Sequence, residues 1–249
     1  MILTGHQPVY LPGIILFNKI ALCDRFMYVG HVQFSRKSWQ QRNRIAIGDR
    51  EFFLSVPVRK SERFGQSIDE TEIEPGPWRR KHLGSIRQAY GKRPYFLNYF
   101  AEIEAIIDHP WRTLGELNRA LLAQFLKWLG IATPIVESRD YGISAHKTDM
   151  LIQMCRALCA DRYLSNEGAR AYVQEDRLAA AGIVHCWQEF EHPIYNQGRP
   201  FIPNLSIIDL LFNVGPEAGD IVRRAGWIRP CALAAADGGS TGRLPSSVI

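Results

Sequence analysis

The sequence predicts an α/β fold, a Rossmann-like layered sheet flanked by helices, with a helical insertion. Residues 1–34 have the pattern of a strand, a polar loop, a helix and a strand, and a second alternation of strands and helices runs from about residue 132 to residue 189. Between these two regions, residues 78–130 carry mainly helical periodicity. We therefore expect a single domain over residues 1–228, with the helical segment around 78–130 inserted in it.

The first unit begins with a short apolar run at residues 2–4, which predicts a strand, and a polar loop follows. Pro12 and Gly13 open a helical period that starts at Ile14, because proline near the first helical position is pre-organised for a helix. Residues 25–34 return to a composition that favours a strand. The unit is a β-loop-α-β arrangement.

The middle of the chain changes from strand signals to helix signals. Pro77 precedes a helical period, and Thr113 with Glu116 matches a capping box, in which the two side chains satisfy the free amides at a helix start. The expected strands are residues 51–58 and 68–73, and the expected helices are residues 78–90, 95–107 and 113–129.

The last third alternates again, with expected strands at residues 132–137, 162–165 and 183–189 and helices at 148–160 and 168–181. Ser206 and Asp209 resemble a helix cap, so we favour a structural role for Asp209 over a catalytic one. Residues 229–249 lose periodicity and are rich in Gly and Ser, which predicts a mobile tail.

Composition narrows the class of protein. The chain has 249 residues, of which 46% are hydrophobic, enough for a core, and it has no secretory signal pattern and no apolar run long enough to span a bilayer. We expect a soluble cytoplasmic protein without membrane insertion. Its five cysteines are odd in number and lie among apolar residues, so a disulfide framework is not expected. No zinc-type spacing is completed, so no metal site is predicted.

The positive charge is concentrated in one region. Residues 36–93 contain 14 Lys and Arg against 7 Asp and Glu, a net +7 in a chain whose total is +5. Aromatic side chains are interleaved with these cations. Such a region could bind nucleotide phosphates, a sugar nucleotide, RNA or an anionic membrane face, or it could be an ordinary solvated basic surface.

A candidate site follows the first strand. His6 and Gln7 come directly after it, and in α/β proteins ligands commonly sit at the carboxyl ends of strands. The alternative is that this polar pair satisfies loop backbone groups.

Two further polar groups are open to both interpretations. Arg79, Arg80, Lys81 and His82 stand in the first turn of an expected helix, where the helix dipole disfavours cations unless an anion is bound. The same side chains could instead reach solvent. Downstream, a polar patch made by His192, Tyr195 and Gln197 could line a cleft or belong to a loop.

Several blocks of this sequence resemble the WbqC-like protein family over about residues 1–220. They include HQPVYLP with Tyr10, then Lys19, and a VQFSRKSWQQRNRI block that contains Gln33 and Trp39; further blocks are RRKHLGSIRQAY at 79–90, YLSNEGARAYV at 163–173, HPIYNQ at 192–197 and LSIIDLLFNVGPE at 205–217. The resemblance implies a bacterial cytoplasmic protein associated with surface-polysaccharide assembly. It also implies transfer of a glycyl or other acyl group to an amino sugar.

The sequence contains no GxSxG elbow, P-loop or GxGxxG fingerprint. Acyl transfer to an amine can proceed without an enzyme nucleophile if a base removes the amine proton and donors stabilise the oxyanion. His6 is the candidate base, because imidazole titrates near working pH. Gln7, Asn43 and His82 are candidates for positioning, and Arg42, Arg44, Arg79, Arg80 and Lys81 for holding phosphates.

The leading hypothesis is therefore a transferase that places an acyl or aminoacyl group on the amine of a nucleotide-linked amino sugar or a similar small amine. The cofactor is undefined beyond a nucleotide or acyl donor, and an aminoacyl-tRNA is one candidate donor. The first alternative is an ATP-dependent amide ligase or nucleotidyl-transfer enzyme. The second alternative is a non-catalytic protein that binds RNA or takes part in polysaccharide assembly.

Overall fold

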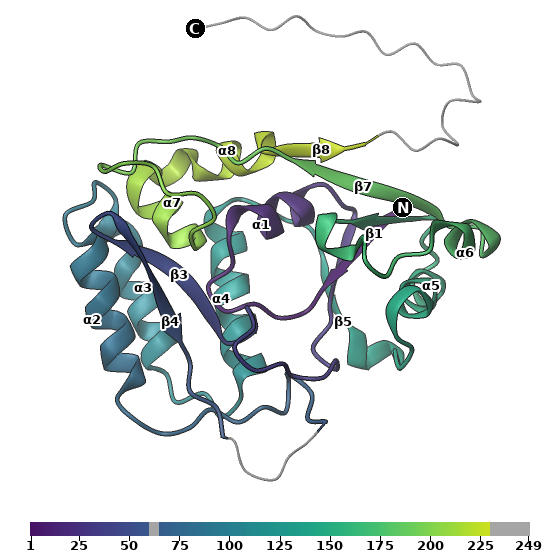
Figure 1. Ribbon diagram of the computed structural model, residues 1–249, viewed down its shortest axis with the longest axis horizontal. Helices are drawn as coiled ribbons and strands as arrows, with labels where there is room; N and C mark the ends of the chain where they lie inside the picture. Colours follow the sequence, from purple (N-terminus) through teal and green to yellow (C-terminus); the bar gives the residue numbers. More distant parts are fainter. Residues whose placement is uncertain (60–64, 230–249) are drawn as a thin grey trace, which may run out of the picture.

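A six-stranded sheet forms the centre of the computed structural model, which describes residues 1–59 and 65–229 (Figure 1). The strand order is β5-β2-β1-β6-β7-β8, and all neighbouring strands are parallel except β7 and β8. The strands are β1 (Ile2–His6), β2 (Arg25–Tyr28), β5 (Ile135–Glu137), β6 (Arg162–Ser165), β7 (Val184–Phe190) and β8 (Gly226–Ile228). The expected α/β fold with a layered sheet is confirmed.

Side chains that alternate along the strands of the sheet pack into two separate cores. Phe26 on β2 packs into a large core with helix α1 (Ile14–Ala21), whereas its neighbour Met27 packs into a smaller core with α5 (Lys147–Ala157) and α6 (Glu175–Ala180). Successive side chains of a strand point to opposite faces, so one strand supplies both cores. The sheet is therefore covered by helices on both faces.

The order of connections reverses beside β1. The chain runs from β1 through α1 to β2 on one side, and later returns through α5 to β6 on the other side of β1. In open α/β sheets the crevice beyond the carboxyl ends of the strands at such a switch point is the usual ligand site. Here that place lies between the ends of β1 and β6.

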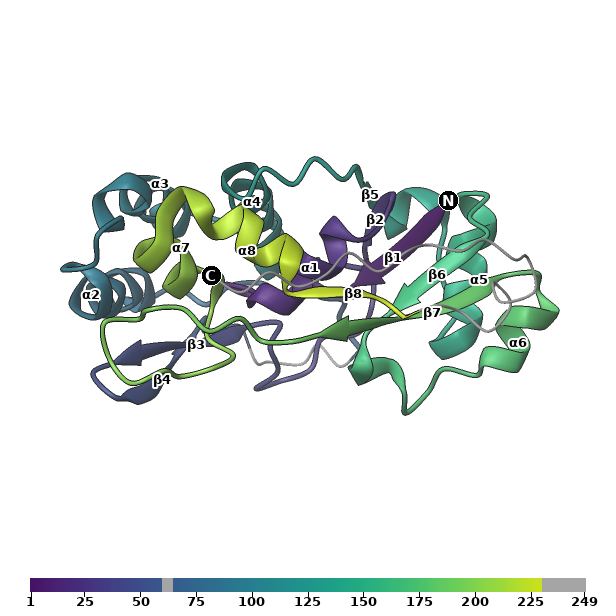
Figure 2. The ribbon, with the colours of Figure 1, turned by 90° about the horizontal axis from the view of Figure 1, so that it is seen from above.

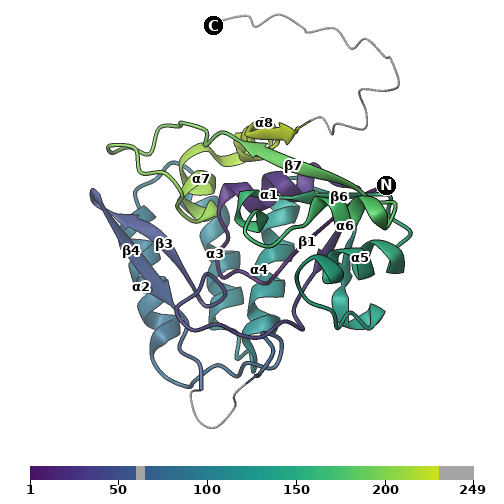
Figure 3. The same cartoon turned by 45° about the vertical axis from the view of Figure 1, so that its right-hand side comes forward.

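The segment between β2 and β5 is one long insertion outside the sheet, which we call the excursion. It comprises the antiparallel hairpin of β3 (Arg42–Ile47) and β4 (Arg50–Ser55) and three helices, α2 (Trp78–Tyr90), α3 (Phe96–Asp108) and α4 (Leu114–Trp128). Figure 2 shows the hairpin and α2 and α3 at one end of the molecule, with α5 and α6 at the other. In Figure 3 the three helices of the excursion run roughly alongside one another. The expected helical segment is present, and the capping box of Thr113 and Glu116 is formed.

The last part of the described chain contains α7 (Ile207–Val214) and α8 (Ala218–Arg224), and short 3-10 helices occur at η1 (Ser138–Tyr141), η2 (Glu167–Ala169) and η3 (Gly215–Glu217). Ser206 caps α7, because its hydroxyl accepts a hydrogen bond from the amide of Ile208 at 3.4 Å. The fully buried Asp209 forms an ion pair with Arg199 and accepts a hydrogen bond from Tyr195. These contacts agree with a structural role for Asp209.

Two expected elements are wrong for the same physical reason. Residues 68–73 form a turn with isolated bridges rather than a strand, since the Thr71 hydroxyl donates to the Ser67 carbonyl at 2.8 Å. The expected helix over 168–181 is broken into η2 and α6, because the Thr148 hydroxyl accepts from the amide of Gln174 and donates to the carbonyl of Tyr172. Side-chain hydroxyls compete with regular backbone hydrogen bonding in both segments.

Other differences concern boundaries. The strand expected over residues 25–34 ends at Tyr28 and the one over 51–58 ends at Ser55, while β3, α8 and β8 carried no prediction. The tail expected after residue 228 lies, from residue 230 onward, outside the described residues. Among the described residues, no helix is both long enough and apolar enough to cross a membrane. Cys23, Cys155 and Cys159 are free thiols, of which Cys159 is exposed.

Candidate functional site

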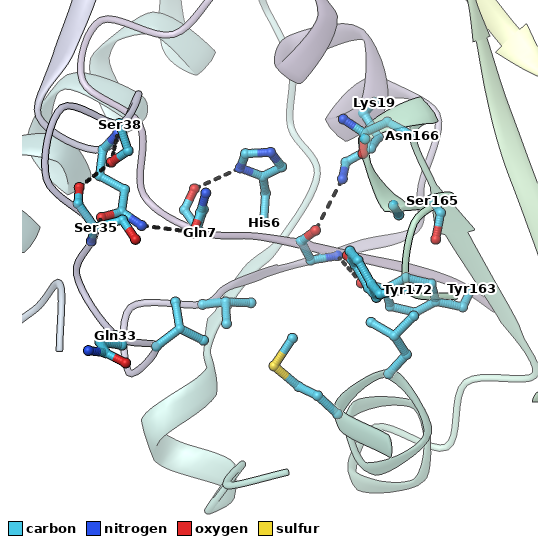
Figure 4. Close-up of a pocket in the computed structure, with 18 residues that line it drawn as sticks. His6, Gln7, Lys19, Gln33, Ser35, Ser38, Tyr163, Ser165, Asn166 and Tyr172 are labelled. Carbon is cyan, nitrogen blue, oxygen red and sulfur yellow. Dashed lines mark hydrogen bonds between the residues drawn. The ribbon is translucent and has the colours of Figure 1, made fainter. Parts of the chain in front are cut away.

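A cavity of about 540 Å³ lies at the switch point, at the carboxyl edge of the sheet (Figure 4). The end of β1 supplies Gly5 and His6, and the end of β6 supplies Tyr163 and Ser165. Lys19 reaches it from α1. The rest of the lining consists of Gln7, Val29, Val32, Gln33, Ser35, Ser38, Gln40, Met150, Leu151, Asn166, Gly168, Ala169 and Tyr172.

Gly5 lets the two strand ends come together. A Cβ at this position would lie 2.4 Å from Cε of Met154 and 3.3 Å from the hydroxyl of Tyr163. The backbone N–H of Gly5 instead donates a hydrogen bond to that hydroxyl at 3.1 Å. The small residue before His6 therefore fits the close packing of β1 against α5 and β6.

His6 presents one ring nitrogen to the cavity. Its Nδ1 lies 2.7 Å from the carbonyl oxygen of Gln7, and because a carbonyl only accepts, Nδ1 carries the proton. This tautomer leaves Nε2 as an acceptor. Burial, and then the charge of Lys19, lower the pKa of His6 to about 3, although the bond to Gln7 acts in the opposite direction. The expectation that His6 titrates near working pH is therefore wrong, and the imidazole is neutral at pH 7.

Lys19 is a buried ammonium group at the opposite wall from Gln33 and Ser35 (Figure 4). The residue is only 3% exposed, and its Nζ donates to the carbonyl of Gly5 at 3.1 Å. No carboxylate of the described residues forms an ion pair with it. Burial lowers the pKa of Lys19 to about 8. Lys19, rather than His6, is the group poised to titrate near neutral pH.

Gln7 is held by a chain of amides. Its Oε1 accepts a hydrogen bond from Nε2 of the buried Gln40 at 2.9 Å, and Oε1 of Gln40 accepts from the amide of Ser35 at 2.8 Å. These bonds fix which way both side-chain amides face. The NH₂ group of Gln7 is consequently the end available to a ligand.

A second hollow of about 400 Å³ adjoins the first and shares His6, Gln7, Asn166 and Gly168 with it. Its outer wall includes Trp39, which is 46% exposed, and Arg44, whose guanidinium lies 5.3 Å from the centre of the Trp39 ring. Arg44 also pairs with Glu51 at 2.9 Å. The hollow therefore combines an exposed aromatic face with a cation that already has a carboxylate partner.

A model of the WbqC-like protein family matches residues 7–221, which is more than half of the sequence. The chain belongs to the WbqC-like protein family. A relative from Mycobacterium tuberculosis (strain ATCC 25618 / H37Rv), named "Uncharacterized protein Rv1507c", is 33% identical over 220 residues, which cover 87% of this chain and 95% of the relative. No solved structure matches the chain.

The fold of this WbqC-like protein brings half of the sequence-predicted site residues together. Those that line one or both hollows are His6, Gln7, Lys19, Gln33, Trp39, Asn43, Arg44 and His192. Asn43 also has a structural task, because its amide donates to the carbonyls of Tyr10 and Leu11. The family match includes all of these except His6, which lies one residue before its start.

The cations predicted at the start of α2 lie outside both hollows. Arg79, Arg80 and Lys81 contribute to neither lining, and Lys81 borders a separate hollow near Trp78. His82 borders that same hollow, is buried, and is held between the Tyr10 hydroxyl at 2.9 Å and the Ser55 carbonyl at 3.2 Å. The structure therefore does not bring His82 or the α2 cations to His6, because α2 belongs to the excursion.

The remaining predicted residues are held in other contacts away from the hollows. Tyr10 is fully buried against His82, and Arg42 lies 4.6 Å from the centre of the Phe53 ring. Tyr195 donates to Asp209, and the buried Gln197 bonds twice to the backbone of Ile202. The polar patch predicted at 192–197 is thus divided, with only His192 on a hollow.

Sequence reasoning missed the part of the lining that comes from β6 and from residues 35–40. The missed polar residues are Ser35, Ser38, Gln40, Tyr163, Ser165, Asn166 and Tyr172. Ser165 and Asn166 follow a correctly predicted strand just as His6 and Gln7 follow the first one. Their place at the carboxyl end of a strand is a local signal for a ligand site. No group of three or more His, Cys, Asp or Glu side chains in the described part of the chain is placed to hold a metal ion.

Proposed function

We propose that this WbqC-like protein is a transferase that places an acyl or aminoacyl group, such as glycyl, on the amine of a small hydroxyl-rich acceptor, an amino sugar linked to a nucleotide. The observation that carries the proposal is the pairing, in one cavity, of a neutral imidazole acceptor on His6 with the buried ammonium of Lys19. Attack of an amine on an acyl group needs both an acceptor for N–H and a partner for the developing oxyanion.

The roles follow from the hydrogen-bonding state of each side chain. Nε2 of His6 accepts a hydrogen bond from the attacking amine and orients its lone pair toward the acyl carbon. The ammonium of Lys19 stabilises the negative charge that forms on the acyl oxygen, and its pKa of about 8 keeps most of it protonated at pH 7. The NH₂ group of Gln7 is a second donor that lines the same cavity.

The acceptor class is inferred from the lining. Side-chain amides and hydroxyls, which can each donate and accept, outnumber charged groups in the larger hollow. Such groups suit the hydroxyls of a sugar. The exposed ring of Trp39 on the adjoining hollow offers a stacking face for a nucleotide base. Acceptor and nucleotide would then occupy neighbouring spaces that meet at His6.

The test is a direct assay of transfer. The purified protein is incubated with a nucleotide-linked amino sugar and either an acyl-coenzyme A or an aminoacyl-tRNA, and the mass of the acceptor is followed. We expect a gain equal to the acyl group, lost in His6→Ala and retained in His109→Ala, a change at an exposed histidine outside the cavity. Loss of transfer after ribonuclease treatment would identify the tRNA as donor.

Two outcomes would replace the proposal. Product formation that requires ATP and releases pyrophosphate would favour an amide ligase. Absence of any transfer, together with salt-sensitive retardation of RNA, would favour the non-catalytic binding protein.

A further inference from the structure

Beside the cavity lies a row of three side chains, a serine on β6, a histidine on β7 and a glutamate on α6. The Oγ of Ser165 lies 2.8 Å from Nε2 of His185, and Nδ1 of His185 lies 3.7 Å from Oε1 of Glu175. Ser165 lines the cavity, whereas His185 lies behind it. These three elements lie together at one end of the molecule in Figure 2.

The register of the sheet produces this arrangement. Tyr163 pairs with His185 and Ser165 pairs with Trp187 along the parallel strands β6 and β7. Residues in register and residues two apart on a strand share a face, so Ser165 and His185 are diagonal neighbours on the face covered by α6. Glu175 opens α6 and is fixed there, because its Oε1 accepts a hydrogen bond from the indole of Trp187 at 2.7 Å.

The hydrogen bonds leave one ring nitrogen without a partner. Nδ1 of His185 is buried and has no hydrogen bond among the described residues, although the carboxylate of Glu175 is its nearest acidic group. With the proton on Nδ1, Nε2 can accept the hydroxyl proton of Ser165. Burial lowers the pKa of His185, with Glu175 opposing that effect, so the ring is neutral and can accept a proton.

We propose that Ser165 is a nucleophile, activated by His185 as its base and by Glu175 as a positioning residue, and that it carries the acyl group between donor and acceptor. Such arrangements occur on unrelated folds and are recognised by geometry rather than by sequence pattern. The inference rests on the proposed function for its donor class, an activated ester or thioester. It adds a covalent acyl-serine intermediate, which the sequence did not predict because it contains no GxSxG elbow.

Ser165, His185, the donor and the acceptor together account for every bond and proton in the two half-reactions. Oγ of Ser165 bonds to the acyl carbon, its proton passes to Nε2 of His185, and the donor alcohol or thiol leaves with that proton. The acceptor amine then attacks the serine ester and gives a proton to Nε2. The bond between Oγ and the acyl carbon breaks, Oγ takes the proton back, and an amide and a free serine remain. Lys19, at the same cavity, stabilises the oxyanion in both steps.

The first experiment needs neither donor nor acceptor. A fluorophosphonate probe reacts with activated serines, displacing fluoride, and peptide mass spectrometry locates the label. We expect one label per chain at Ser165, none in Ser165→Ala, and undiminished labelling in Ser144→Ala, which removes an exposed hydroxyl outside both hollows. His185→Gln should slow labelling by about 100-fold or more, the usual worth of a general base.

The variant Glu175→Gln distinguishes weaker activation of Ser165 from a loss of folding. The side chain of Glu175 is 58% exposed, so Glu175→Gln keeps a bond to Trp187 and leaves the thermal midpoint unchanged. We expect it to slow labelling of Ser165 by roughly 3- to 10-fold, because it weakens the orientation of His185. Absence of any label on folded wild-type protein, or full-rate labelling in folded His185→Gln, would overturn the proposal.

The outcomes also separate this inference from the proposed function. Transfer to an amino sugar at an unchanged rate in Ser165→Ala would keep the function and remove the acyl-serine. Labelling at Ser165, with acyl groups passed to water and never to amines, would keep the nucleophile and reject the transferase.

Discussion

The hydroxyl of Tyr163 on β6 accepts a hydrogen bond from the backbone N–H of Gly5 on β1 at 3.1 Å, on the floor of the cavity. Register pairing of these two strands covers only Ile2 with Arg162 and Leu3 with Tyr163. The side-chain bond therefore continues the junction of β1 and β6 toward the carboxyl edge, where the backbone pairing has stopped.

We expect Tyr163→Phe to destabilise the protein by about 1–3 kcal/mol, because it leaves the partly buried amide of Gly5 without an acceptor. Urea unfolding at pH 7 measures this. Tyr172→Phe is the matched control, since Tyr172 lines the same cavity but none of the hydrogen bonds described for it involves its hydroxyl. Equal stability of both variants would show that the Gly5 amide finds another partner.

Lys19→Met should stabilise the protein at pH 7 and lose that advantage as pH rises. The pKa of Lys19 is about 8 in the folded protein, below the usual 10.5, so the unfolded chain binds this proton more tightly than the folded protein does. Protonated Lys19 therefore lowers the free energy of unfolding below pH 8. This destabilisation is at most about 3 kcal/mol, and it disappears between pH 8 and 10.5. The gain in Lys19→Met is smaller by the contribution of the hydrogen bond from Lys19 to Gly5, which the variant loses. Urea midpoints at pH 7 and 9.5 test it, with Lys127→Met on the exposed side of α4 as control. A pH-independent difference would contradict the burial of an unpaired ammonium.

The imidazole of His6 should remain neutral throughout the range from pH 8 to pH 5. Its pKa is lowered to about 3, first by burial and then by the charge of Lys19. In Lys19→Met the pKa of His6 should therefore be higher than in the wild type. Proton NMR of the imidazole C–H, assigned by comparison with His6→Ala, follows both. Titration of His6 near pH 6.5 in the wild type would mean that the ring is solvated.

Asp209→Ala should cost about 3–5 kcal/mol, because it leaves the Arg199 guanidinium as a buried charge without its partner. The side chains of Arg199 and Asp209 are 5% and 0% exposed. Asp220→Ala removes the partner of Arg223 in a pair that is 43% and 73% exposed, and should cost less than about 1 kcal/mol. Similar thermal midpoints for the two variants would show that Arg199 relaxes to solvent.

Local signals located much of the fold. The helix at Trp78–Tyr90 and the strand at Arg162–Ser165 match their predicted bounds, because each has a clear periodicity or apolar run and a defined boundary. The strand β3 was not predicted, since its sequence begins with alternating Arg and Asn and is stabilised by pairing with β4. Pairing across the hairpin is a tertiary contact that composition does not report.

The site was predicted in part for a similar reason. His6 was found from its place after a strand, which is a local signal, whereas the α2 cations were grouped with it only by charge. The excursion carries α2 away from the sheet edge, so nearness in the sequence did not become nearness in space. Conversely Gln40 and Gln7 are 33 residues apart and are joined by a hydrogen bond that only the folded chain forms.

The excursion between β2 and β5 contributes to both hollows, with Gln33, Ser35, Ser38 and Gln40 in the larger one and Trp39, Asn43 and Arg44 in the smaller one. Trp39 and Arg44, on the outer wall, belong to it, whereas His6, Lys19 and Ser165 belong to the sheet and its first helix. The groups at the strand ends and the outer wall of the smaller hollow thus come from separate stretches of the sequence. Substitution of Trp39 or Arg44 can therefore reshape the outer wall while the groups at the strand ends keep their places.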